Sequence, residues 1–139
     1  MATDPSQVRD ILASARRIAV VGLSPRPERP SHGVAQYLQR AGYQIIPVRP
    51  GPETTILGEP IVPDLVAARK AGPIDIVDIF RRSSAIPDLV NDILAVRPRL
   101  VWMQQGVEHE ASAAVLEAAG IPVVMDHCLA VEHHSMVGG

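Results

Sequence analysis

Arginines follow three of the short apolar runs in this sequence. Arg49 comes directly after the run at 44–48, and other arginines come shortly after the runs at 18–21 and 74–80. The five arginines after these runs are Arg26, Arg29, Arg49, Arg81 and Arg82. A planar guanidinium donates two parallel hydrogen bonds to a phosphate, whereas a lysine ammonium acts as a point charge. If the runs are parallel strands, these arginines share one edge of a sheet and predict a ligand with several phosphates.

A glycine ends the first apolar run, but its surroundings differ from the dinucleotide-binding fingerprint. That fingerprint has the pattern Gly-x-Gly-x-x-Gly and an acid after the second strand, which holds the ribose hydroxyls. Ser24 stands where a second glycine would follow Gly22, and Arg49 stands where the acid would be. An arginine there suits a phosphorylated ribose. NAD is therefore disfavoured, while NADP and coenzyme A (CoA), which both carry a ribose phosphate, remain open.

Five apolar runs would position these residues. They span 18–21, 44–48, 74–80, 100–103 and 122–125, and each is bounded by glycine, proline or polar residues. Helix signals lie between them: a leading helix at 6–15, a helix capped by Ser31 and stopped by Gly42, segments at 63–72, 83–93 and 108–119, and a short closing helix after Asp126. This alternation predicts an α/β fold, a Rossmann-like open parallel five-stranded sheet with helices on both faces.

Composition narrows the class of protein. The chain has 139 residues, 47% hydrophobic and 20% charged, which predicts one globular domain over residues 1–139. The formal net charge of -2 favours no nucleic-acid partner, and no apolar run is long enough to make the membrane a partner. One cysteine and no evident signal peptide indicate a reducing compartment, so we expect a cytoplasmic location.

The other sequence features that could carry chemistry are two adjacent histidines and the single cysteine. The phosphate-binding loop Gly-x-x-x-x-Gly-Lys-Ser/Thr is absent. His133 and His134 are adjacent, and adjacent side chains on a helix do not face one site, so we expect surface residues or a cap and no metal. Cys128 follows the fifth run, at the predicted ligand edge. A free cysteine is more often a small buried residue than a reactive one.

Several blocks of sequence resemble the small stand-alone CoA-binding proteins of bacteria and archaea, which are related to the N-terminal CoA-binding domain of the succinyl-CoA synthetase α subunit. The resemblance extends over about 11–134, and its specific blocks are Phe80-Arg81-Arg82-Ser83 and Trp102-Met103-Gln104-Gln105-Gly106. The sequence departs from the family at His127, where arginine is frequent. The phosphorylated histidine of succinyl-CoA synthetase lies in a second domain that has no counterpart here, so the resemblance implies binding without catalysis.

The resemblance also implies roles for individual residues. Gly22, Leu23 and Ser24 would lie against the pyrophosphate and pantetheine, and Arg26, Arg29 and Ser31 near phosphates. Arg49 and Pro50 would border the adenosine, Phe80, Arg81 and Arg82 would cover the adenine side, and Gln104 and Gly106 would line the pantetheine arm.

Three functions follow from these observations. The favoured one is a non-catalytic protein that binds CoA or acyl-CoA at the carboxyl edge of the sheet. The alternatives are an NADP-binding oxidoreductase-like domain, for which the chain leaves no substrate domain, and a protein of CoA-thiol or redox chemistry that uses Cys128. A homodimer or an unidentified protein partner is left open.

Overall fold

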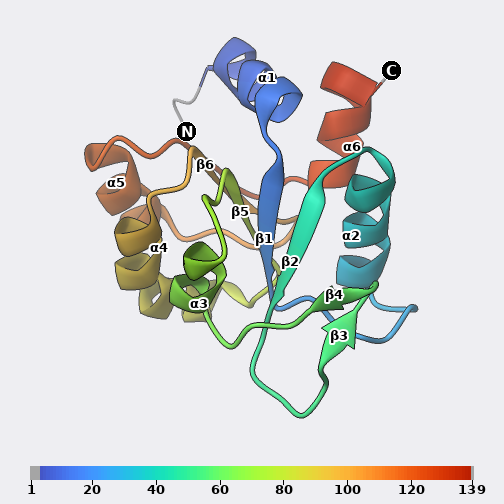
Figure 1. Ribbon diagram of the computed structural model, residues 1–139. Helices are drawn as coiled ribbons and strands as arrows, with labels where there is room; N and C mark the ends of the chain where they lie inside the picture. Colours follow the sequence, from blue (N-terminus) through green and yellow to red (C-terminus); the bar gives the residue numbers. More distant parts are fainter. Residues whose placement is uncertain (1–3, 139) are drawn as a thin grey trace.

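The protein was analysed as a computed structural model, which describes residues 4–138. Its centre is a parallel five-stranded sheet with the strand order β2-β1-β5-β6-β7. The strands are β1 (Arg17–Val21), β2 (Gln44–Val48), β5 (Ile76–Ile79), β6 (Leu100–Met103) and β7 (Val123–Val124). Each corresponds to one predicted apolar run (Figure 1). The predicted Rossmann-like α/β fold is therefore confirmed.

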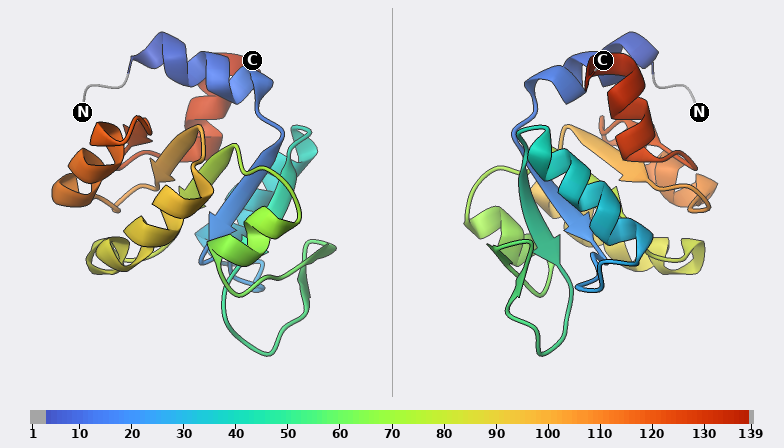
Figure 2. Two further views of the ribbon diagram at one scale, coloured as in Figure 1. Left: turned by 60° about the vertical axis from the view of Figure 1, so that its left-hand side comes forward. Right: turned by 90° about the vertical axis from the view of Figure 1, so that its right-hand side faces the viewer.

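Helices cover both faces of this sheet (Figure 2). One face packs against α1 (Pro5–Ser14), α2 (Pro30–Arg40) and α6 (Leu129–His133), and α6 continues into the π-helical segment η2 (His134–Gly138). The other face packs against α3 (Leu65–Lys70), α4 (Val90–Val96) and α5 (Glu110–Ala118). Successive strand residues point to opposite faces. In β1, Ile18 and Val20 therefore join the α2 side, while Ala19 and Val21 join the α4 side.

Two helix boundaries differ from those predicted from the sequence. Ser31 does not cap α2, because the helix begins one residue earlier, at Pro30, and the capping position belongs to Arg29. A proline is well suited to the first helical position, since its missing N–H is not needed there. The segment predicted as one helix at 83–93 is divided into η1 (Ser83–Leu89), a 3-10 helix, and α4. Pro87 lies inside η1, and it has no N–H for an α-helical hydrogen bond.

A small hairpin beside β2 was not predicted. It consists of β3 (Thr55–Ile56) and β4 (Glu59–Pro60), joined by Leu57 and Gly58 with φ angles of 53° and 78°. Two positive φ angles are typical of a type I′ turn, but leucine is rarely found in one, so little in the sequence indicates this turn. Gln39 of α2 donates a hydrogen bond of 2.9 Å to the Leu57 carbonyl and anchors the hairpin.

The chain after the hairpin returns to the edge of β2. Val62 forms a parallel bridge with Val48, its N–H donates to the Pro47 carbonyl, and its carbonyl accepts from the Arg49 N–H. The loop that starts at Arg49 is thus held at both ends against the sheet. Among residues 4–138, no helix is long and apolar enough to cross a membrane.

Candidate functional site

The carboxyl ends of β1, β2 and β5 meet at Gly22. The Gly22 N–H donates to the Val48 carbonyl at 2.9 Å, and the Phe80 N–H donates to the Val21 carbonyl at 2.8 Å. Gly22 has a φ of 86°, and a Cβ added there would collide with the carbonyl oxygen of Phe80. Glycine is therefore required by the neighbouring strand itself. In this strand order, the chain after β1 runs to β2 and the chain after β5 runs to β6, in opposite directions along the sheet. The order therefore reverses between β1 and β5, and α/β proteins bind ligands at such a point.

A cleft of about 530 Å³ opens beside this turn, and we call it the arginine cleft. Its walls are Gly22, Ser24, Pro25, Arg26, Arg29, Pro30, Ser31, Arg49, Glu53 and Phe80. Seven of these residues were predicted as site residues from the sequence. Arg26 and Arg29 are exposed to solvent, and Arg49 is half-buried. The cleft combines three guanidinium groups with one carboxylate, so it favours an anionic ligand.

The loop over the arginine cleft is ordered by two serines. The Ser31 hydroxyl, which is buried, accepts a hydrogen bond of 3.0 Å from the Ser24 N–H. The Ser24 hydroxyl in turn accepts one of 3.1 Å from the Arg26 N–H. No side chain caps the N-terminus of α2 at Arg29. The positive end of this helix dipole therefore adds to the arginines at the same wall.

Arg49 connects the ends of β1 and β2. Its Nη1 donates to the Leu23 carbonyl at 3.2 Å, and its Nε lies 3.8 Å from Oε1 of Glu53. Glu53 was not predicted from the sequence, because only Arg49 and Pro50, the residues directly after the second apolar run, were considered as site residues there. The signal available was its place in the same short loop as Arg49, beyond Gly51. Arg49 therefore faces both a backbone acceptor and a carboxylate.

A second cleft, of about 490 Å³, lies beyond Phe80, and we call it the apolar cleft. It is lined by Pro30, Val34, Phe80, Arg81, Arg82, Gln104, Gln105, Val107 and Cys128. Phe80 and Pro30 line both clefts, so the two clefts are adjacent. Gln104 is buried and accepts a hydrogen bond of 3.2 Å from the Leu129 N–H, so it fixes the start of α6. Cys128 is half-buried at this wall, whereas the sequence favoured a fully buried core position.

Three residues that the resemblance implicated line neither cleft. The Leu23 side chain is fully buried in the core, and its carbonyl is occupied by Arg49. Pro50 is exposed in the loop after β2. Gly106 is exposed after β6, and its N–H donates to Oδ1 of Asp126 at 2.7 Å. These residues shape the loops around the clefts rather than their surfaces.

Asp78 lies in β5 beneath the clefts, and the sequence reading assigned it no role. It is fully buried between Val20 and Trp102 in neighbouring strands, and neither carboxyl oxygen has a hydrogen-bond partner. Burial raises its pKa well above the usual range. Phe80 follows two residues later and points to the same face, about 7 Å along the strand. Asp78 therefore places a carboxyl whose neutral form is favoured by burial just below the floor of the site.

The prediction of surface positions for the two adjacent histidines was half wrong. His133 is buried, its ring packs edge-on against Tyr37 and Tyr43, and its Nδ1 lies 2.8 Å from the Tyr37 hydroxyl. Burial, followed by the influence of His134, lowers its pKa. His134 is exposed. In the part of the chain that the structure describes, no three His, Cys, Asp or Glu side chains are grouped so as to hold a metal ion.

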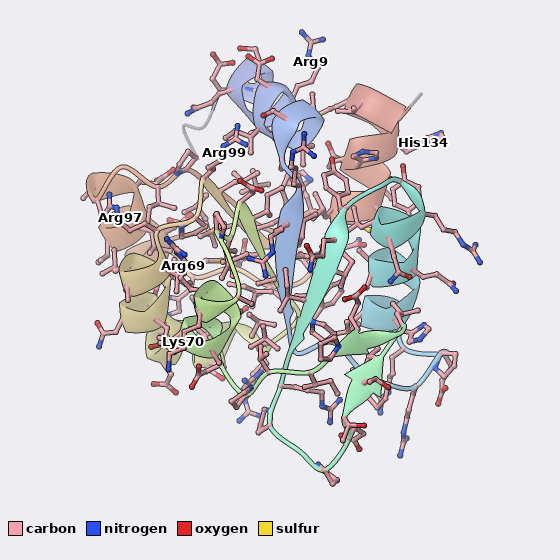
Figure 3. All side chains as sticks on the ribbon, in the orientation of Figure 1. Arg9, Arg69, Lys70, Arg97, Arg99 and His134 are labelled. Carbon is pink, nitrogen blue, oxygen red and sulfur yellow. The ribbon has the colours of Figure 1, made fainter. Side chains whose placement is uncertain are left out.

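The other basic residues lie away from the two clefts. Figure 3 labels Arg69, Lys70, Arg97 and Arg99 on the side of α3, α4 and α5, and Arg9 on α1 at the opposite end of the sheet. Arg99 precedes β6, pairs with Asp75 at 3.7 Å and donates to the Ser14 hydroxyl. These contacts tie helices to strand ends, so the arginines at the carboxyl edge form a separate group.

Comparison with known proteins agrees with this geometry. The chain is 42% identical over 130 residues to the uncharacterized protein YneT of Bacillus subtilis, covering 92% of this chain and 93% of that protein. A solved structure from Thermus thermophilus, cell-free ID.343, has 41% identity and a TM-score of 0.91, covering 96% of this chain and 99% of the other.

A second solved structure, a hypothetical protein from Pyrococcus horikoshii OT3, has 28% identity and a TM-score of 0.90. It covers 99% of this chain and 94% of the other. Residues 16–134, which include every residue of both clefts, match the family described as CoA binding domain. The chain therefore belongs to the CoA binding domain family.

Proposed function

We propose that this chain is a single-domain protein that binds CoA or acyl-CoA at the carboxyl edge of the sheet, without catalysing a reaction. The observation that carries the proposal is the junction of two unlike clefts at Phe80 and Pro30. One cleft has three arginines, and the other presents a mostly apolar surface, although Arg81, Arg82, Gln104 and Gln105 also line it. CoA has the same two-part chemistry, a nucleotide with three phosphates and a long, uncharged pantetheine arm. Family membership supports this choice of ligand.

In this proposal the phosphates occupy the arginine cleft. Arg26 and Arg29 lie on the loop before α2, and the helix N-terminus lies between them and Ser31. Gly22 and Ser24 present their backbone to the pyrophosphate. Arg49 is the candidate partner of the ribose phosphate, because it stands at the end of β2. Arg26 and Arg29 are exposed and Arg49 is half-buried, so all three are accessible to a ligand.

The pantetheine arm is proposed to pass Phe80 and continue along Gln104 toward Cys128. Arg81 and Arg82 line the apolar cleft and would flank the adenine or the first part of the pantetheine arm. Leu23, Pro50 and Gly106 would then act through the backbone and loop shape, since none of them lines a cleft. A cytoplasmic location and the absence of nucleic-acid and membrane partners remain predictions made from composition.

A thermal-shift panel with CoA, dephospho-CoA, NADP and ATP tests this function. Saturating CoA, at about 100 times its dissociation constant, should raise the melting temperature by about 10 °C. NADP should have a smaller effect, because it has no pantetheine arm for the apolar cleft. No stabilisation by CoA would reject the proposal. A larger effect of NADP than of CoA would favour an oxidoreductase-like domain.

A second candidate function concerns the thiol of Cys128. Its half-buried position at the wall of the apolar cleft favours an exchange with a CoA disulfide entering from the arginine cleft. The Cys128 thiolate would attack one sulfur, form a protein–CoA disulfide and release the second CoA as a thiolate. Intact mass spectrometry under non-reducing conditions should show one added CoA per chain, and Cys128→Ser should show none. An unmodified wild-type mass after incubation with CoA disulfide would reject this candidate.

A further inference from the structure

Glu53 is the only acidic side chain among the described residues that line the arginine cleft. Its Oε1 lies 3.8 Å from Nε of Arg49, in a wall that otherwise presents cations, hydroxyls, prolines and Phe80. A carboxylate in a site for phosphates repels the ligand. Its presence therefore needs an explanation beyond the binding of phosphate.

The loop after β2 is shaped so that this carboxylate can reach back. Gly51 has a φ of 141°, and a Cβ added to it would lie 2.9 Å from Oε1 of Glu53. A side chain at this position would push the carboxylate away from Arg49. Both ends of the loop are held, at one end by the Arg49 N–H bond to Val62 and at the other by the hairpin. The approach of Glu53 is thus built into the backbone of the loop.

Contacts within the protein hold Arg49 in position. Nη1 is bonded to the Leu23 carbonyl and Nε faces both Glu53 and the Pro50 carbonyl, at 3.5 Å from the latter. The side chains of Arg49 and Glu53 are 29% and 37% exposed. An ion pair at this separation and exposure is weak and can be exchanged. A phosphate monoester, with nearly two negative charges, is a stronger partner for the guanidinium than one carboxylate.

We propose that Glu53 is an internal counter-anion that occupies Arg49 in the empty site and is displaced by the ribose phosphate of the ligand. Glu53 thereby lowers the affinity for ligands that bear this phosphate and leaves ligands without it nearly unaffected. It is a specificity-determining residue of the cleft, acting through Arg49. This inference rests on the proposed function, because it assumes that the ribose phosphate reaches Arg49.

Isothermal titration of CoA and dephospho-CoA against Glu53→Gln tests the inference. Removing one like charge next to the phosphate should tighten CoA binding about fivefold and change dephospho-CoA binding by less than about twofold. Glu28→Gln is the matched control, because Glu28 is exposed on the loop beside the cleft but does not line it. In the background of Arg49→Ala, Glu53→Gln should no longer favour CoA over dephospho-CoA.

Each result has one meaning. Equal tightening of both ligands, or the same effect in Glu28→Gln, would show a general charge effect and overturn the inference. Weaker CoA binding in Glu53→Gln would also overturn it, since Glu53 would then support the ligand or the pose of Arg49. If the wild-type protein binds neither CoA nor dephospho-CoA, the proposed function itself fails. If it binds both and Glu53→Gln changes neither, only the inference fails.

Discussion

Ionisable groups lie in two very different regions close to the same strand ends. In the arginine cleft, Arg49 is partly hydrated and faces a carbonyl and a carboxylate. In the sheet interior, Asp78 is fully buried and has no partner for either oxygen. The positive charge of Arg49 is therefore accessible to an anionic ligand. The interior holds a carboxyl that must be neutral, since an unpaired buried charge costs several kcal/mol.

The difference teaches where stability and function are separated in this fold. Four arginines at the edge are exposed and Arg49 is half-buried, so each contributes little to folding and can contact a ligand. Asp78 costs stability in the core and lies one layer below Phe80, at the floor of the site. Gly22 joins the two regions, because it allows β2 and β5 to approach β1 at the strand end.

The largest expected effect on stability comes from Gly22, which lies between the arginine cleft and the sheet interior. Gly22→Ala places a Cβ against the Phe80 carbonyl and strains a φ of 86°, so it should lower the free energy of unfolding by about 3 kcal/mol or more. Chemical denaturation measures this loss. Gly33→Ala is the matched control, because Gly33 lies in α2 with open space around it. This substitution should leave the free energy of unfolding unchanged or raise it. Equal stability of the two variants would mean that the strand ends can separate at little cost.

Asp78→Asn should change how stability depends on pH. The raised pKa means that folded Asp78 keeps its proton while the unfolded side chain, with a pKa near 3.9, has lost it. Stability of the wild-type protein therefore falls as pH rises above about 4, by up to about 1.4 kcal/mol per pH unit, until the folded pKa is passed.

The free energy of unfolding of Asp78→Asn lacks this decrease, so the variant should become increasingly more stable than the wild-type protein as pH rises. Urea unfolding at a series of pH values from 4 to 8 measures the difference. Asp88→Asn, at an exposed site of η1, is the control for loss of a carboxylate. A constant difference between wild type and Asp78→Asn at every pH would show that folding does not raise the pKa of Asp78.

The smallest of the three effects concerns the edge alone. Arg49→Ala should weaken CoA binding by about 1.5–3 kcal/mol and weaken dephospho-CoA binding much less, because the charge-assisted bond to the ribose phosphate is lost. Calorimetry with both ligands measures the selectivity. Arg9→Ala removes the same charge from α1, far from the cleft, and should leave both affinities unchanged (Figure 3). Equal losses for the two ligands would place the ribose phosphate elsewhere.

The sequence by itself determined how the five sheet strands alternate with helices along the chain, and that arginines follow three of these strands. Apolar runs bounded by glycine and proline are local signals, and parallel strands bring whatever follows them to a common edge. The departure from the dinucleotide fingerprint at Ser24 and Arg49 could also be predicted, because each residue stands at a fixed distance from the end of a strand.

Tertiary structure alone decided the contacts that cross from one element to another. Ser31 was read as a cap, yet its hydroxyl serves the Ser24 N–H in the preceding loop. Glu53 meets Arg49 only because the loop after β2 folds back over Gly51. Asp78 is unpartnered only because two strands and a helix layer close over it. The physical reason is common to all three: hydrogen-bond partners and desolvation depend on neighbours in space, which residue types and their spacing do not specify.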